Sequence, residues 1–235
     1  MTAASILAEL EPLGSGQIKR IFMRHGAREP LFGVKVEQLK VFQKRIRQDY
    51  ALSLDLYASG NSDAMYLAGL ISDPARMREA DLNRWAAEAY WYMLSDYAVA
   101  WTAAESPFAL KLAREWMDSG EELVSSAGWC TYASALAVRP DTQLDAGEVL
   151  DLLRRAEREL PQAPNRARYS MNGFVIAAGS YMPELTQAAI DTALRIGQVS
   201  VDMGGTACKV PEAAAYIRKV MAAGKLGKKR KTAKC

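Results

Sequence analysis

The feature that most constrains this chain is a recurring pair of helical segments. Helix-forming stretches follow one another in twos at roughly 35–45 residues, which is the spacing of HEAT-type helical repeats. The pairs are 48–60 with 61–74, 106–120 with 121–138, and 144–160 with 166–182. In the last two pairs the second segment is richer in Ala, Gly and Ser, and small residues allow a helix to approach its neighbours closely. We therefore expect the second segments to form an inner layer.

Local patterns support these helices. Val36, Leu39, Phe42 and Ile46 recur at steps of three and four residues and make one apolar stripe. The segment 144–160 is also amphipathic, and 106–120 begins with Ser-Pro and ends at a glycine, as helices often do. Strand signals are scarce, and no Asn-Gly or Asp-Gly hairpin turn separates two alternating runs.

The pattern predicts an all-α fold, a HEAT-like helical-repeat superhelix (an α-α solenoid), formed by a single domain over residues 1–224. Such a solenoid has a concave face that can bind something long. Because the repeats are degenerate, a plain helical bundle is the alternative.

Charge is distributed unevenly. The chain carries a net charge of +3, but residues 225–235 hold six basic residues and no acid. The body, residues 1–224, therefore has 24 basic and 27 acidic residues and a net charge of −3. We interpret 225–235 as a basic, flexible C-terminal tail. Two interpretations of this tail have equal weight: it is a solvated chain end, or it contacts nucleic-acid phosphates independently of base sequence.

Several chemistries lack their usual residues. The only histidine is His25, which we interpret as a surface or turn residue, and the three cysteines show no CxxC spacing. The glycine-rich stretches do not follow strands and so are not convincing phosphate loops. We expect no metal, no cofactor, and reduced thiols at Cys130, Cys208 and Cys235. No apolar run reaches a membrane span and no signal peptide begins the chain, which indicates a cytoplasmic protein without a membrane contact.

The stretch AYWYMLSDYAVAWT, residues 89–102, has one carboxylate, Asp96, among two Trp and three Tyr. Tyr92 lies four residues before Asp96, so the two share a face of a continuous helix. Asp96 is either a cap for the following helix or the one charged group of an aromatic-lined cleft.

Three stretches together resemble the AlkD-type DNA alkylation repair family: FGVKVEQLKVFQKRI, YALSLDLYASGNSDAMYLAGLI, and the segment from Trp91 to Trp129. The closing stretch IGQVSVDMGGTACKVPEAAAYIRKV resembles a divergent branch of it. The resemblance covers nearly the whole chain. It implies a HEAT-like superhelix whose concave basic face holds duplex DNA, and an alkylpurine DNA glycosylase that excises cationic N3- or N7-alkylated purines without flipping the base.

The resemblance also implies residue roles. Asp96 matches the catalytic aspartate, which stabilises the cationic sugar electrostatically. Tyr92 matches the first aromatic residue of the cleft, with Trp91 beside it and Trp129 as a further lining residue. Ser125 and Ser126 stand where the family's cleft arginine is expected, and Phe174 or Ile176 where its second Trp is expected.

We expect contacts to the DNA backbone from basic side chains of the body and tail: Arg24, Arg28, Lys35, Lys40, Lys44, Arg166, Arg168, Lys228, Lys229, Arg230 and Lys231. No helix carries an evident base-reading pattern, so the expected partner is double-stranded DNA bound weakly and without sequence preference by a monomer. Two alternatives to the glycosylase remain open. One is a non-catalytic protein that binds DNA structures on the same scaffold, and the other is a protein-binding scaffold.

Overall fold

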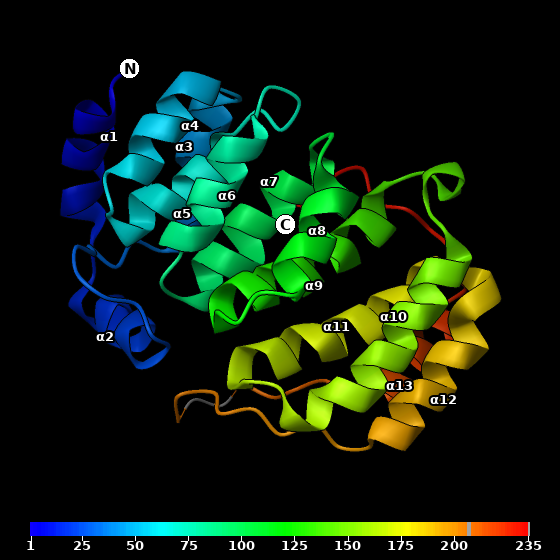
Figure 1. The fold of residues 1–235 in the computed structure, drawn as a ribbon. Helices are drawn as coiled ribbons and strands as arrows, with labels where there is room; N and C mark the ends of the chain where they lie inside the picture. Colours follow the sequence, from blue (N-terminus) through cyan, green and yellow to red (C-terminus); the bar gives the residue numbers. More distant parts are fainter. Residues whose placement is uncertain (206–207, 235) are drawn as a thin grey trace.

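The structure is a computed structural model that describes residues 1–205 and 208–234. Within these residues the regular elements are helices and no strand occurs (Figure 1). The α-helices are α1 (Ala3–Leu10), α2 (Gly16–Arg24), α3 (Val36–Ile46), α4 (Tyr50–Ala58), α5 (Ser62–Ile71), α6 (Glu79–Glu88), α7 (Ala100–Glu105), α8 (Ala109–Met117), α9 (Glu122–Val138), α10 (Ala146–Glu159), α11 (Asn165–Tyr181), α12 (Thr186–Ile196) and α13 (Ala213–Ala222). Short turns η1 (Glu11–Leu13), η3 (Asp141–Gln143), η4 (Leu160–Gln162) and η5 (Pro183–Leu185) join some of them, and η2 (Met93–Val99) is a π-helical segment that runs into α7.

From α4 onward the helices form pairs, as predicted. The pairs are α4 with α5, α6 with η2 and α7, α8 with α9, α10 with α11, and α12 with α13. The second members lie side by side, because α5 packs on η2, η2 and α7 pack on α9, and α9 packs on α11, which packs on α13. We call this row the inner layer and its surface away from the first helices the inner face. The predicted all-α, HEAT-like architecture is confirmed.

The sequence explains why these helices begin and end where they do. Asn61 accepts hydrogen bonds from the amides of Asp63 and Ala64 and so caps α5. Asp145 caps α10 in the same way. On α3 the predicted stripe places Leu39 and Phe42 in the core.

Glycines let the inner layer pack closely. A Cβ atom on Gly69 would lie 2.6 Å from the Cα atom of Ala98, and one on Gly128 would lie 2.6 Å from the backbone nitrogen of Met117. Real Cβ contacts are almost never this short. The small residues of the second segments therefore do what the sequence predicted: they bring η2 against α5 and α9 against α8.

The apolar core has two clusters. The first contains Trp85, which stacks on Tyr57 with ring centroids 4.2 Å apart. The second contains Trp129, whose ring lies edge-on to Phe174 at 5.2 Å. Leu110 packs against both clusters. Among the described helices none has both the length and the apolar character to cross a membrane.

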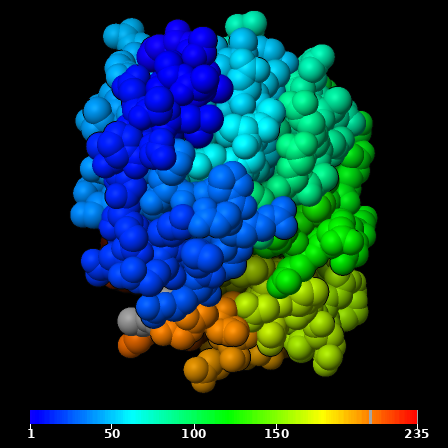
Figure 2. Space-filling model, turned by 90° about the vertical axis from the view of Figure 1, so that its left-hand side faces the viewer, coloured from blue at the N-terminus to red at the C-terminus, as the bar shows by residue number. Residues whose placement is uncertain are grey.

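Two distant parts of the chain meet beside the inner layer. The loop that follows α12 approaches the end of α2 so closely that a Cβ atom on Gly204 would collide with the carbonyl oxygen of Arg24. Figure 2 shows the N-terminal segment in blue meeting the orange C-terminal loop on one face of the molecule. This contact brings residues from α2 near the site described next.

Candidate functional site

Asp96 lies in η2, where the helix widens. The amide of Ala100 donates to the carbonyl oxygen of Ser95, five residues earlier, which is the hydrogen-bond pattern of a π-helix. Such bulges re-aim side chains and are frequent at functional sites. Asp96 is buried, with 4% of its surface exposed. Its side chain does not cap α7, so the helix-cap interpretation is wrong.

Three side chains satisfy the Asp96 carboxylate. The hydroxyls of Ser95 and Ser126 donate to Oδ1 at 2.8 and 2.6 Å, respectively. Arg166 donates from Nη2 to Oδ2 at 2.7 Å and forms a salt bridge in which its own side chain is 13% exposed. The backbone amide of Arg166 donates to Glu122, which holds the start of α11 against the start of α9. The carboxylate is therefore already paired with a cation of the same chain.

Arg166 is held between two aromatic rings. Its Cζ atom lies 4.2 Å from the ring centroid of Tyr92 and 4.5 Å from that of Tyr169. Aromatic faces attract a guanidinium electrostatically, and the effect is larger where water is excluded. Burial works against the charged form, but Asp96 more than offsets it, so the pKa of Arg166 lies above its ordinary value. We call Tyr92, Asp96, Ser126, Arg166 and Tyr169 the Arg166 cluster.

The surroundings of the cluster include a histidine and a thiol. The ring of His25 lies edge-on to Tyr92 at 5.6 Å. Burial, and then the charges of Arg166 and Arg24, lower the pKa of His25 and so favour its neutral ring. Burial raises the pKa of the Cys130 thiol well above its ordinary value. Cys130 is a free cysteine, Cys208 is exposed, and Cys235 lies outside the described residues.

Two of the predicted cleft residues have almost no exposed surface. Trp91 is 3% exposed, and its indole nitrogen donates to Ser62 inside the first core cluster. Trp129 is 1% exposed and packs on Phe174 in the second cluster. Their rings are thus part of the core in this structure, and the cleft role expected for them is not supported. Apolar rings at helical spacing have the same sequence pattern in a core and in a cleft.

The predicted DNA-contact residues of the body lie on different elements of the fold. Arg24 and Arg28 are exposed at and after the end of α2, and Arg28 lies over the ring of Tyr90 at 4.5 Å. Lys35 is exposed and forms an ion pair with Glu37, while Lys40 and Lys44 lie on α3. On α11, Arg166 belongs to the cluster and Arg168 is half-buried, with its Nε atom lacking a hydrogen-bond partner among the described residues. Of the predicted site residues, the structure brings together Asp96, Tyr92 and Arg166.

The C-terminal segment is not loose, in contrast to the expected flexible tail. The amides of Gly227 and Arg230 donate to the carbonyl oxygens of Ser180 in α11 and Ala137 in α9 at 2.9 and 2.7 Å. The amide of Ala233 donates to Glu105 at the end of α7 at 2.5 Å. Residues 225–234 therefore run across the carboxyl ends of successive inner helices, and we call them the C-terminal strap.

Two strap lysines are used for this attachment. Lys229 donates to the carbonyl oxygens of Leu136 and Tyr181 and pairs with Asp141 at 2.7 Å. Lys234 donates to the carbonyl oxygens of Leu70 and Ser72 at 3.2 and 3.1 Å. The last carbonyls of a helix are unpaired and partially negative, so an ammonium group there is favourable.

The lysines that contact helix ends differ from their neighbours. We expected Lys229 to contact DNA, but its amine donates to the carbonyl oxygen of Leu136. Lys228, Arg230 and Lys231, in contrast, are exposed. A sequence rich in lysine has the same composition whether it is solvated or bound to helix ends, so composition alone did not distinguish the two.

Sequence reasoning missed Tyr169, the second ring of the cluster. The second aromatic position was expected at Phe174 or Ile176, but Phe174 is fully buried in the core. Tyr169 follows Arg166 by three residues on α11, so the two share a helix face. That spacing was a signal in the sequence. The partnership of Asp96 with Arg166 joins residues 70 positions apart and left no local signal.

Comparison with known proteins gives a family match. The model of the family described as DNA alkylation repair enzyme matches residues 6–217. The chain is 33% identical over 217 residues to the uncharacterised protein Lin0241 of Listeria innocua, covering 90% of this chain and 93% of that protein. The uncharacterised protein Lmo0209 of Listeria monocytogenes matches with the same identity and coverage.

One solved structure is similar over its whole length. It is described as a new family of proteins related to the HEAT-like repeat DNA glycosylases with affinity for branched DNA structures. Its chain shares 38% sequence identity with this one and superimposes with a TM-score of 0.90, with both chains covered completely.

Proposed function

Because the chain belongs to the DNA alkylation repair enzyme family, we propose that it binds DNA along the inner face and responds to strand structure without excising a base. The observation that carries this proposal is the Arg166 cluster. A glycosylase that acts on cationic bases needs a carboxylate free to stabilise a positively charged sugar. Here the carboxylate of Asp96 is 2.7 Å from a guanidinium that the chain supplies itself.

Displacing the Arg166 guanidinium from Asp96 costs free energy. The Arg166 side chain is 13% exposed and lies against the rings of Tyr92 and Tyr169. Breaking a buried ion pair on one side costs about 3–5 kcal/mol, because the remaining charge is left without a partner. A cationic substrate would have to meet this cost before it gained anything from Asp96. The cluster therefore supports a structural role for Asp96 more than a catalytic one.

The same scaffold favours binding to the DNA backbone. Exposed cations lie at the end of α2 and along the C-terminal strap, and phosphate contacts from such side chains do not depend on base sequence. The solved relative is described as having affinity for branched DNA structures. We extend that preference to this chain, so that junctions and other branched substrates bind more tightly than a linear duplex of the same composition.

The proposal is tested by measuring dissociation constants for a four-way junction and for linear duplexes of matched length across a salt series. We expect salt-sensitive binding, little dependence on sequence, and tighter binding of the junction. Affinity that does not change with salt would contradict the proposal. Equal affinity for the junction and the duplex would contradict the preference for branched DNA and leave only general DNA binding.

A second candidate function is excision of cationic N3- or N7-alkylated purines, with Asp96 as the electrostatic residue. One observation favours it: a carboxylate and two aromatic rings, Tyr92 and Tyr169, occur together in the cluster. It requires Arg166 to leave when the lesion arrives. Release of N7-methylguanine from methylated duplex DNA tests it directly. Excision by the wild type that falls at least a hundredfold in Asp96→Asn would establish this function over the first.

A further inference from the structure

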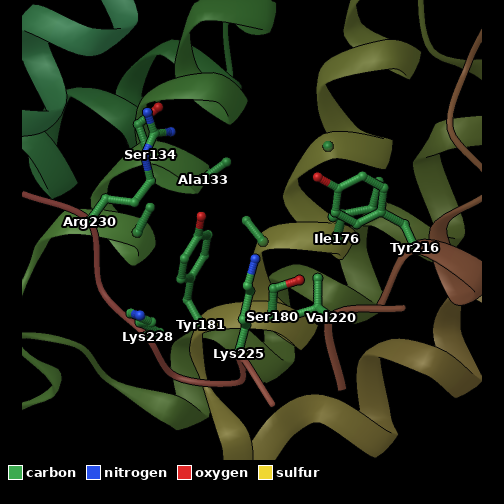
Figure 3. Close-up of a pocket in the computed structure, with 13 residues that line it drawn as sticks. Ala133, Ser134, Ile176, Ser180, Tyr181, Tyr216, Val220, Lys225, Lys228 and Arg230 are labelled. Atoms are coloured by element: carbon green, nitrogen blue, oxygen red, sulfur yellow. The ribbon is translucent and has the colours of Figure 1, made fainter. Parts of the chain in front are cut away.

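A cavity lies on the inner face, away from the Arg166 cluster. It has a volume of about 400 Å³ and is lined by residues of α9, α11, α13 and the first part of the C-terminal strap (Figure 3). Gly128 faces α8, and Ala137 follows it by nine residues, or two and a half helical turns. Ala137 and the cavity therefore lie on the side of α9 that is opposite to α8.

The charged residues that line this cavity are all basic. Its lining residues include Lys225, Lys228 and Arg230 and no acidic residue. Within the part of the chain that the structure describes, neither Lys225 nor Lys228 forms an ion pair, whereas Lys229, the residue after Lys228, is paired with Asp141. Cations gathered without a counter-charge repel one another, and an anion that enters the cavity relieves this repulsion.

A buried hydroxyl also lacks a partner at this place. Ser180 is 5% exposed, and its Oγ atom has no hydrogen-bond partner among the described residues. A buried polar group without a partner is rare in native proteins and calls for a ligand or a water molecule. Ser180, Tyr181 and Lys225 all line this cavity (Figure 3).

Hydroxyl, amine and guanidinium donors around one cavity suit a phosphate group. Phosphate presents several acceptor oxygens, and charge-assisted hydrogen bonds from Lys and Arg are the strong ones. We propose that this cavity is a phosphate site and that the phosphate belongs to a DNA strand lying along α11. This inference rests on the proposed function, because it names the place where the inner face holds the DNA backbone.

The distance between the cavity and the Arg166 cluster can be compared with the dimensions of DNA. Arg166 and Ser180 are separated by 14 residues on α11, so they stand about 21 Å apart along the helix axis. That distance corresponds to roughly six base-pair steps along the axis of a DNA duplex, at about 3.4 Å per step. A duplex segment of that length therefore spans the distance from the Arg166 cluster to the cavity along α11.

The first test compares two double variants of equal charge. Lys225→Gln with Lys228→Gln removes two cations that line the cavity, and Arg84→Gln with Lys219→Gln removes two exposed cations that do not. We expect the cavity pair to weaken binding of a four-way junction about tenfold and to lower the slope of log affinity against log salt by one to two. The control pair should leave both nearly unchanged. Equal losses in the two variants would overturn the site.

The second test uses a change without charge. Ser180→Ala removes the unpartnered hydroxyl, and because a hydrogen bond to a charged group is lost, we expect about a tenfold loss of affinity for DNA. Titration of the wild type with inorganic pyrophosphate, followed by the fluorescence of the lining residues Tyr181 and Tyr216, should report binding that Ser180→Ala weakens. Pyrophosphate that does not bind would overturn the phosphate site.

The outcomes separate the two proposals. If the wild type binds DNA and both changes in the cavity leave this affinity intact, only the role of the cavity is overturned. Pyrophosphate binding that depends on Ser180, together with unchanged DNA affinity, would assign the site to a small phosphorylated molecule and overturn the DNA source. Wild-type protein that binds no DNA would overturn the proposed function, and with it the strand along α11.

Discussion

Arg166 and Asp96, 70 residues apart in sequence, form a buried ion pair in which Nη2 lies 2.7 Å from Oδ2. The pair joins α11 to η2, and Ser126 of α9 donates to the same carboxylate at 2.6 Å. Three neighbouring members of the inner layer are therefore tied together at one carboxyl group. The relationship makes Asp96 a structural element of the helix stack, whatever else it does.

Asp96→Asn should destabilise the protein by about 3–5 kcal/mol, because it leaves the buried guanidinium of Arg166 without an anion. Urea unfolding measures this loss. The double variant Asp96→Asn with Arg166→Gln should recover part of it, since the uncompensated charge is then gone. If the single change costs less than about 0.5 kcal/mol, water screens the pair and the structural role is wrong.

Two glycines of the inner layer should respond to alanine in opposite ways. Gly128→Ala places a Cβ atom 2.6 Å from the backbone of α8, which must shift, so we expect destabilisation of about 1–3 kcal/mol. Gly173→Ala, on α11, meets no atom within 4 Å and should stabilise the helix by about 0.5–1 kcal/mol. Thermal unfolding of both variants tests the pair. Similar effects in the two would argue against the close packing of α9 on α8.

Truncation after Gly224 should lower the stability of the whole protein. It removes the backbone contacts of the strap to Ser180, Ala137 and Glu105, each worth about 0.5–1.5 kcal/mol net. We expect a loss of about 2–4 kcal/mol, which for a chain of this size lowers the melting temperature by roughly 4–16 °C. Lys231→Gln is the control, because Lys231 is exposed and should not change stability. An unchanged melting temperature after truncation would mean that the strap does not support the helix stack.

The strap should hold more tightly at high pH. Burial lowers the pKa of Lys234 to about 8, although Glu105 and Asp73 act in the opposite direction. A detached strap returns this lysine to its usual pKa near 10.4, so the detached form binds more protons between those values. Attachment therefore strengthens as pH rises from 8 to about 10.4, by up to roughly 3 kcal/mol, and changes little below pH 8.

Lys234→Met isolates this effect, because methionine does not titrate. The difference in unfolding free energy between wild type and Lys234→Met, measured at pH 7 and pH 10, should move in favour of the wild type at the higher pH. A difference that is constant with pH, or that moves the other way, would show that the Lys234 amine is not buried as the structure has it.

The helices and their pairing were predictable because their causes are local. The stripe on α3 depends on the 3.6-residue period, and the start of α5 depends on Asn61 next to the first helical amides. The spacing of the pairs gave the repeat architecture. The glycines of the second segments predicted the inner layer, since only small residues permit the approach seen at Gly69 and Gly128.

The candidate site was predictable only in part. Asp96 and Tyr92 share one segment, and the resemblance to the family pointed to both. Trp91 and Trp129 carry the same kind of signal, yet both lie in the core. Whether an aromatic side chain faces a groove or a neighbouring helix depends on how helices rotate against each other, and no single segment determines that rotation.

The sequence by itself determined where helices form, how they pair and which ones carry the small residues of the inner layer, because propensity, capping and periodicity act within a few residues. Only the tertiary structure decided that Arg166 meets Asp96 between two tyrosines and that Lys229 and Lys234 hold the ends of inner helices. Those contacts join residues between 70 and 164 positions apart: Arg166 with Asp96 at 70, Lys229 with Leu136 at 93 and Lys234 with Leu70 at 164. Their energies come from burial and charge pairing, which exist only once the helices have stacked.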